Sequence, residues 1–213
     1  MKKIIGILVV AFLLMSFQQR EIDLKKLQFR EGVFYEEGSA VGYTGVARSY
    51  YDTGELKVEL LLIDGKAEGK SVHCFRNGNY DAILTYKNGK EEGVMMYYYE
   101  EGGIELETTY VAGVKEGQTK NYRKDGGVEA ITYYKKGKLD GVAIYNYADG
   151  ALLSQINWVN GKRDGVSKWY YENGKLKVEE CFIAGKKEGV FKIYDIEGKL
   201  ERKETWINGV KQE

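Results

Sequence analysis

The sequence predicts an all-β fold, an elongated single-layer antiparallel meander of tandem 24-residue β-hairpin repeats preceded by a signal peptide. Three observations predict it. Glycine recurs at a fixed 24-residue interval, and segments rich in β-branched and aromatic residues lie between the glycines. The 213-residue chain also contains 27 Gly, 18 Tyr and no Pro. Because no long segment is suitable for a crossover helix, we expect successive strands to pair antiparallel.

Residues 1–17 have the pattern of a secretory signal peptide. Lys2 and Lys3 precede a stretch without charge, from Ile4 to Phe17. A membrane-spanning helix needs roughly 20 apolar residues, so an uncleaved membrane anchor is the weaker interpretation. We therefore predict an exported protein that is periplasmic, attached to the cell surface or secreted.

Residues 18–44 precede the repeats and are predicted to be an N-terminal capping segment. Residues 21–28 are expected to form a short helix or an irregular lead-in, and residues 32–35 and 41–44 to form strands. A sheet that grows by repeats has an unpaired first edge, which invites aggregation unless other residues cover it.

Residues 45–213 are predicted to form seven repeats, marked by three columns of structural turn glycines. The first column is Gly45, Gly69, Gly93, Gly117, Gly141, Gly165 and Gly189. The second lies nine residues later: Gly54, Gly78, Gly102, Gly126, Gly150, Gly174 and Gly198. The third lies eleven residues further on: Gly65, Gly89, Gly113, Gly137, Gly161, Gly185 and Gly209. Dipeptides such as Asn77-Gly78 and Asn173-Gly174 tolerate the positive φ of tight hairpin turns, so each repeat is predicted to be one hairpin.

The second segment of each repeat alternates between apolar and polar residues, which indicates a strand with one wet face. Two columns of this segment are predicted to share a face and to form the core. One column lies seventeen residues after the first glycine: Leu62, Tyr86, Tyr110, Tyr134, Trp158, Phe182 and Trp206. The other lies eleven residues after it: Leu56, Tyr80, Ile104, Val128, Leu152, Leu176 and Leu200. An acidic residue precedes the next repeat at six places and is expected in the return turn: Glu68, Glu92, Glu116, Asp140, Asp164 and Glu188.

Charge and composition exclude several function classes. The 32 basic residues balance the 32 acidic residues, so nucleic acid is not an expected partner. His73 is the only histidine, and Cys74, its neighbour in a strand, should point to the other face. Cys74 and Cys181 lie at different positions of the repeat and are expected to be unpaired. We predict no catalytic residues, no metal site and no cofactor.

The residues also resemble a known family. The unit from Gly165 to Gly189 is similar to the bacterial MORN repeat variant. Arg30-Glu-Gly-Val-Phe-Tyr35, followed by Tyr43-Thr-Gly45, resembles the start of secreted members that are often labelled antitoxin-like. The resemblance implies tethering of a protein or a membrane. His73-Cys74, Arg123 and Asp195 depart from the aromatic pair of the repeat.

Aromatic residues five and six residues after the first glycine are the candidate binding site. Neighbouring positions in a strand point to opposite faces, so each face should carry an aromatic row. One row is Tyr51, Phe75, Tyr99, Tyr147 and Tyr171. The other is Tyr50, Tyr98, Tyr122, Tyr170 and Tyr194. Two interpretations remain open: the rings pack between repeats, or they bind a partner because a single-layer sheet leaves one apolar face exposed.

The predicted function is a non-enzymatic protein–protein interaction module of the bacterial envelope or exterior, with an unidentified protein partner. The alternatives are a module that binds a glycan or a membrane lipid surface, and an antitoxin-like component of a toxin–antitoxin pair. Aromatic faces suit sugars, whereas no basic cluster suits anionic lipid.

Overall fold

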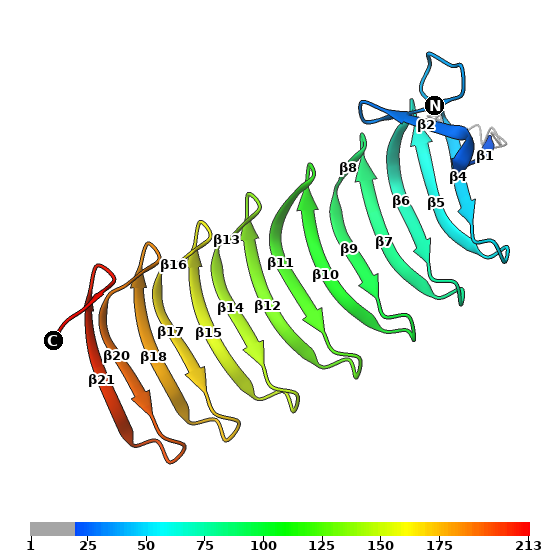
Figure 1. The fold of residues 1–213 in the computed structure, drawn as a ribbon. Helices are drawn as coiled ribbons and strands as arrows, with labels where there is room; N and C mark the ends of the chain where they lie inside the picture. The colour runs from blue at the N-terminus through cyan, green and yellow to red at the C-terminus, as the bar shows by residue number, and fades with distance from the viewer. Residues whose placement is uncertain (1–19) are drawn as a thin grey trace, which may run out of the picture.

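The computed structural model describes residues 20–213 and shows one long, single-layer sheet of curved strands (Figure 1). Strands make up 65% of the described residues, and consecutive strands pair antiparallel along the sheet. The predicted all-β meander is confirmed. The predicted signal peptide lies outside the described residues.

Seven hairpins form the sheet, one for each 24-residue repeat, and we number the repeats one to seven from Gly45. Their first strands are β4 (Gly45–Tyr50), β6 (Lys66–Cys74), β9 (Gly93–Tyr98), β11 (Val114–Tyr122), β14 (Gly141–Asn146), β17 (Gly165–Tyr170) and β20 (Gly189–Tyr194). Their second strands are β5 (Leu56–Ile63), β7 (Tyr80–Lys87), β10 (Ile104–Val111), β12 (Val128–Lys135), β15 (Leu152–Val159), β18 (Leu176–Ile183) and β21 (Leu200–Ile207). Two-residue strands follow five of these hairpins: β8 (Lys90–Glu91), β13 (Lys138–Leu139), β16 (Lys162–Arg163), β19 (Lys186–Lys187) and β22 (Val210–Lys211).

The return turns between repeats need a left-handed backbone at two successive residues. Asn88 has a φ of 51° and Gly89 a φ of 77°, and the same pair of signs recurs in every repeat. Two central residues with positive φ match the turn type whose twist fits a hairpin. The first glycine column has another role, because the pairing of β5 with β6 skips from Leu60 opposite Ser71 to Leu61 opposite Glu68. Gly69 therefore lies at a bulge where the strand is entered.

The acidic residues before each repeat anchor these return turns. The Glu92 carboxylate accepts a hydrogen bond from the Ala112 backbone N–H at 2.8 Å, and the Asp164 carboxylate accepts one from Ala184 at 2.8 Å. The same contact, twenty residues apart, recurs for the other four acids, Glu68, Glu116, Asp140 and Glu188. Each acid thus satisfies a backbone donor of the next turn, which explains why a carboxylate recurs there.

The sheet has an inner face, defined as the face that the N-terminal segment covers, and an outer face. Ala47 and Leu62 lie on the inner face, while the Arg48 guanidinium and the Glu59 carboxylate meet on the outer face at 2.6 Å. Each hairpin changes its alternation near its tip. In repeat six, Trp169 pairs with Val178 but Tyr170 pairs with Leu176, so Lys177 is an extra residue.

This bulge makes one sequence prediction wrong. The columns eleven and seventeen residues after the first glycine were expected to share a face, but they lie on opposite faces. Tyr80, from the first column, contacts the Tyr98 ring at 6.1 Å, and the Tyr98 hydroxyl lies 3.4 Å from the Met96 sulfur on the outer face. The Phe182 ring, from the second column, lies on the inner face beside Arg163. The extra residue in each second strand reverses the alternation that the sequence pattern had extended through it.

The most deeply buried column was not predicted. It lies two residues after the first glycine, on the inner face, and each member is at most 5% exposed: Ala47, Ser71, Met95, Thr119, Ala143, Ser167 and Phe191. Its members differ in size and polarity, so no hydrophobic pattern marks it. Two of its three polar members make local hydrogen bonds: the Ser71 hydroxyl donates to the Glu59 carbonyl at 3.1 Å, and the Thr119 and Thr108 hydroxyls lie 2.8 Å apart.

The N-terminal segment covers the first edge and part of the inner face. It consists of β1 (Glu21–Asp23), a 3₁₀ turn (Leu24–Lys26), β2 (Leu27–Arg30) and β3 (Val33–Glu36). β1 pairs with β4 in parallel, and β2 and β3 form a separate hairpin near the N-terminal end of the sheet (Figure 1). The helix considered for residues 21–28 is only the 3₁₀ turn, because strand pairing takes the residues on both sides. Residues 41–44 contribute one bridge, between Gly42 and Tyr35, instead of a strand.

The buried cluster of the fold lies beneath this segment. Tyr43, which is 2% exposed, packs with Ala47, Leu60 and Leu62, and Phe34 of the hairpin packs against them. Further partly buried members are Ile22, Leu24, Leu27, Val58 and Ala67. The N-terminal segment therefore supplies a second layer over the first repeats, and the other repeats have none among the described residues.

Candidate binding surface

The inner aromatic row connects successive repeats. The hydroxyl of Tyr99 donates a hydrogen bond to the Tyr122 carbonyl at 2.6 Å, and that of Tyr147 donates to the Tyr170 carbonyl at 2.7 Å. Tyr51 and Tyr171 make the same bond, each to the residue 23 positions later, at 2.8 Å. These hydroxyls satisfy backbone carbonyls of the neighbouring repeat, so a packing role is visible for four of the candidate residues.

Three members of this position depart from the pattern, and each departs differently. Arg123 replaces the tyrosine in repeat four and donates to the Asn146 carbonyl, so a guanidinium makes the same connection. Phe75 has no hydroxyl to donate. Asp195 accepts a hydrogen bond from the Lys199 backbone N–H at 2.7 Å within its own hairpin. The structure therefore explains why an arginine is tolerated at this position.

The second aromatic row lies on the outer face. The Tyr122 hydroxyl donates to the Glu107 carboxylate at 2.9 Å, Tyr98 contacts Tyr80, and Tyr50 is 45% exposed. Tyr170 and Tyr194 are half-buried. The candidate residues thus occupy both faces, and they do not converge on one site.

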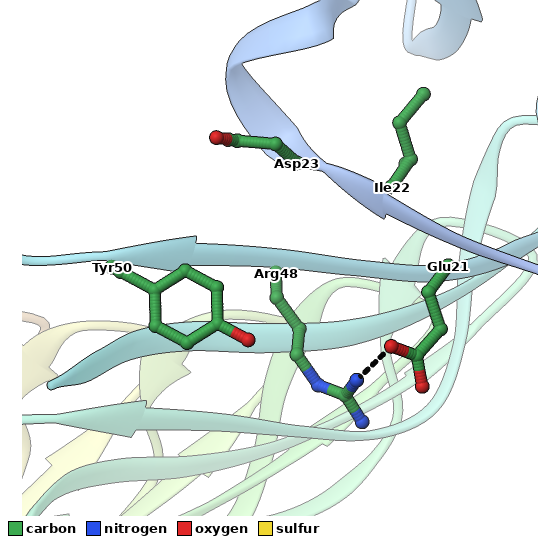
Figure 2. Close-up of a pocket in the computed structure, with 5 residues that line it drawn as sticks. All are labelled: Glu21, Ile22, Asp23, Arg48 and Tyr50. Carbon is green, nitrogen blue, oxygen red and sulfur yellow. Dashed lines mark ion pairs between the residues drawn. The ribbon is translucent and has the colours of Figure 1, made fainter. Parts of the chain in front are cut away.

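Tyr50 borders a small hollow of about 190 Å³ where β1 lies on β4. Figure 2 shows the Arg48 guanidinium directed at the Glu21 carboxylate, and these groups are 2.6 Å apart. The hydrogen bonds that Arg48 donates to the Glu59 carboxylate, and then to the Glu21 carboxylate, raise the pKa of Arg48 above its usual range. This ion pair ties the capping strand to the first repeat, which gives the hollow a structural role.

The inner face of repeats five to seven is the surface that differs most from the rest. All three tryptophans of the chain lie on it, together with two phenylalanines: Trp158, Trp169, Phe182, Phe191 and Trp206. Phe182 and Phe191 are buried, with ring centroids 5.8 Å apart, whereas the tryptophans are partly exposed. We call this set the tryptophan surface.

Cations of the chain stack on these rings. The Arg163 guanidinium lies 5.4 Å from the Trp169 ring and 5.3 Å from the Phe182 ring, and the Lys187 ammonium lies 4.5 Å from the Trp206 ring. Such contacts favour a fixed position for both charge and ring. Sequence reasoning did not single out Arg163, Lys187 or Trp169. The available signal was that tryptophan occurs only in repeats five to seven. In these repeats the residue 22 positions after the first glycine is basic: Arg163, Lys187 and Lys211.

Acidic groups alternate with these cations across the surface. The Glu180 carboxylate lies 3.9 Å from the Arg163 guanidinium of repeat five and 4.0 Å from the Lys187 ammonium of repeat six, so it lies between the two cations. The Glu204 carboxylate accepts hydrogen bonds from the Trp206 indole N–H at 3.1 Å and from the Lys211 ammonium at 3.0 Å. The bond from Lys211 is the main reason that the pKa of Glu204 lies below its usual value. The surface therefore presents both signs of charge among aromatic rings.

Two buried polar atoms of this region have no hydrogen-bond partner within residues 20–213. They are the indole nitrogen of Trp158 and the hydroxyl of Ser167, a residue that is fully buried. Beside them, a hollow of about 230 Å³ is lined by Tyr147, Leu153 and Trp169 and carries Lys177 and Glu180 among its polar groups. Unsatisfied donors, rings and charges of both signs are features of a surface that binds another molecule.

The outer face of the same repeats is a set of exposed ion pairs. Lys192 donates to Glu179 at 2.8 Å, and Lys168 lies 3.6 Å from the same carboxylate. The bond from Lys192 is the largest influence that lowers the pKa of Glu179. Exposed pairs of this kind contribute little to stability and are typical of a solvated face.

His73, the only histidine of the chain, lies beside a serine hydroxyl that is bonded to the backbone. The Ser71 hydroxyl, 3.2 Å from the His73 Nε2 atom, donates to the Glu59 carbonyl at 3.1 Å. Burial lowers the pKa of His73 and raises that of the Cys74 thiol, which keeps the thiol protonated. Cys74 and Cys181 are both free, as predicted.

Within residues 20–213, no three His, Cys, Asp or Glu side chains are grouped so that they could hold a metal ion. In the same part of the chain, the structure contains no helix with the length and apolar character needed to span a membrane.

The sequence matches the family described as MORN repeat variant over five segments: residues 43–64, 91–112, 139–160, 163–184 and 187–208. The chain belongs to this family. MORN repeats are non-catalytic modules that generally bind proteins or membrane phospholipids. A search of curated proteins found no match to the chain.

The MORN matches omit repeats two and four, although both have the same hairpin structure. Repeat two carries Cys74, preceded by His73, and repeat four carries Arg123, each in place of one aromatic residue of the pair. In both repeats the entering strand, β6 or β11, is continuous over nine residues. The backbone of the MORN hairpin is therefore kept where its sequence pattern is lost.

Proposed function

We propose that this MORN-repeat chain is a non-enzymatic binding module that holds a protein partner on the tryptophan surface. The observation that carries the proposal is that all three tryptophans lie partly exposed on one uncovered face, with Arg163 and Lys187 stacked over their rings. Tryptophan, tyrosine and arginine are the residues that dominate the energy of protein interfaces.

The charge pattern favours a protein over an anionic membrane. Arg163 and Lys187 have Glu180 between them, and Lys211 contacts Glu204, so no patch of uncompensated positive charge develops. Anionic lipid is recognised by clusters of several basic residues. A protein surface with charges of both signs and an apolar centre is complementary to this arrangement.

We further propose that the protein is exported to the bacterial envelope or exterior. Support comes from the uncharged stretch between Ile4 and Phe17 that follows Lys2 and Lys3. Sequencing the amino terminus of the protein from its native cell tests this, because export with cleavage predicts a mature chain that begins near Gln18. An intact amino terminus in a cytoplasmic fraction would contradict it and favour the antitoxin-like alternative.

Photo-crosslinking tests the binding surface with a matched pair of positions. Trp169 and Lys168 are neighbours in β17 and lie on opposite faces. A photoreactive phenylalanine analogue at Trp169 should give one protein adduct in native cells, and the same analogue at Lys168 should not give it. The proposal is wrong if the adduct forms equally from both positions, or if it contains only lipid.

A glycan is a second candidate ligand, and the hollow lined by Tyr147, Leu153 and Trp169 favours it. Aromatic rings stack on sugar faces, and Lys177 and Glu180 supply polar groups at its border. A carbohydrate adduct from the Trp169 position, with no protein adduct, would support this candidate over a protein partner.

A further inference from the structure

The N-terminal segment and the first two repeats enclose an apolar cavity that the proposed function does not use. Its volume is about 360 Å³, which is within the range of pockets that bind small molecules. Leu24 and Phe34 of the N-terminal segment form one wall. Leu60 and Tyr86 of the inner face form part of the other.

The lining excludes a charged ligand. It contains no Asp, Glu, Lys or Arg, and its polar side chains are His73, Ser71 and Tyr86. Ser71 is already bonded to the Glu59 carbonyl and contacts the His73 ring. Burial lowers the pKa of His73, which favours the uncharged imidazole, and raises that of Tyr86, which keeps its phenol protonated. A carboxylate or phosphate would enter this cavity without a countercharge, which is costly.

The rim of the cavity carries an apolar side chain that has little cover. Phe29 of β2 is 63% exposed, although its ring lies 4.6 Å from the partly buried Phe34 ring. An aromatic side chain at the opening of an apolar cavity gains cover when a ligand fills the opening. The cavity lies between a hairpin and a sheet and is partly open to solvent, so a small molecule can enter it from solution.

We propose that this cavity binds a free, uncharged and mostly apolar small molecule, with His73 and Tyr86 available to a single polar group of the ligand. The site is separate from the tryptophan surface in repeats five to seven. Binding there is therefore independent of the protein partner, and either proposal can fail without the other.

Titration with N-phenyl-1-naphthylamine, a neutral fluorophore that brightens in apolar surroundings, tests the site on the full chain. We expect saturable binding of the fluorophore and its displacement by 1-octanol. Octanoate has the same chain length, but the lining offers no countercharge to its carboxylate, so it should displace the fluorophore at least tenfold more weakly. Absence of saturable binding, or equal displacement by octanoate, would overturn the proposal.

Two variants locate the binding. Ala67→Phe fills the cavity, whereas Leu139→Phe adds the same ring at the equivalent position of repeat four, outside the cavity. We expect tenfold or greater loss of affinity only in the first. If Ala67→Phe does not fold, as judged by circular dichroism, Phe29→Ser provides an exposed alternative that should weaken binding. Unchanged affinity in the folded variants, or binding to phosphatidylcholine vesicles that 1-octanol does not reduce, would contradict a small-molecule site.

Discussion

The two ends of the inner face share one backbone plan but differ in what lies over them. In repeats one and two the N-terminal segment covers the face, and Leu60, Leu62 and Ala67 lie beneath it. In repeats six and seven the corresponding positions are held by charged and aromatic residues, such as Glu180, Phe182 and Lys187, and no described residues cover them. The comparison teaches that the repeat determines the backbone, while the inner-face side chains can differ from one end of the sheet to the other.

The covered end, in repeats one and two, contributes stability through buried aliphatic side chains. At the uncovered end, in repeats five to seven, stacked cations hold the aromatic rings in place. Leu62 is fully buried, whereas Trp158 at the equivalent position of repeat five is partly exposed and lies 5.9 Å from the Arg163 guanidinium. An uncovered face of aliphatic residues would aggregate, but rings with stacked cations and intervening carboxylates remain hydrated. The tryptophan surface can therefore be exposed without a permanent second layer.

The largest expected effect is on stability, when one inner-face side chain at each end is truncated to alanine. Leu62→Ala should lower the free energy of unfolding by about 2–5 kcal/mol, because it opens a void in a closed cluster. Trp158→Ala removes a larger side chain but should cost less, about 1–3 kcal/mol, because its site is partly open to solvent and truncation there leaves no closed void. Urea denaturation followed by circular dichroism measures both changes.

Because repeat proteins unfold in segments, the midpoint should also be read from tryptophan fluorescence, which reports only on repeats five to seven. If far-ultraviolet circular dichroism shows that Trp158→Ala lowers the free energy of unfolding more than Leu62→Ala does, the comparison between the two ends is wrong.

A smaller effect is expected at the hydroxyls that connect repeats. Tyr147→Phe leaves the Tyr170 carbonyl without its partner and should destabilise the chain by about 1–2 kcal/mol. Tyr145→Phe, in the same strand, is the matched control, because the Tyr145 hydroxyl has no hydrogen bond within residues 20–213. Thermal unfolding of the two variants should separate them, and equal melting temperatures would show that the hydroxyl contact adds nothing.

Removing one return-turn carboxylate should lower the free energy of unfolding by about 1 kcal/mol. Asp164→Ala removes the acceptor for the Ala184 N–H, whereas Glu129→Ala removes an exposed acid that makes no ion pair or side-chain hydrogen bond among the described residues. Faster amide hydrogen exchange at Ala184 in the first variant alone is the expected result. No change in exchange at Ala184 would mean that the turn holds without its carboxylate.

The smallest effect is a pH dependence confined to the covered end. Burial lowers the pKa of His73 in the folded chain, so the unfolded chain binds the proton more readily. This contribution to stability is complete above about pH 6.5 and is lost as the pH falls below it. Glu179 and Glu204, whose pKa values are lowered from 4.5, act only at lower pH.

Denaturation midpoints between pH 7 and pH 5.5 should therefore fall for the wild type and fall less for His73→Phe. Parallel slopes for the two proteins would assign the pH dependence to other groups.

The sequence was sufficient to predict the hairpins, their number and the single-layer meander, because glycine and Asn-Gly dipeptides mark each turn directly. It could not predict which columns share a face, because the extra residue at Lys177 and its equivalents leaves the spacing of the glycines unchanged. The buried column that includes Ser71 and Phe191 was missed for a related reason, since burial there follows from backbone position and not from residue type.

The candidate site was predicted only in part. Both aromatic rows lie where alternation placed them, on opposite faces, but the role of the Tyr99 and Tyr147 hydroxyls depends on a carbonyl 23 residues away. The convergence of Trp169 and Arg163 depends on the pairing of β16 and β17 with the same strand, β15, which no local pattern contains.

Hydroxyl-radical footprinting of the native protein in its own cell extract, compared with the purified chain, tests the central claim most directly. Trp158, Trp169 and Trp206 should lose most of their labelling in the extract, while the exposed outer-face residues Tyr50 and Tyr80 should label equally in both samples. That result would place a bound partner on the tryptophan surface. Unchanged labelling of the three tryptophans, with protection of Tyr50 and Tyr80, would place the contact on the outer face and contradict the account.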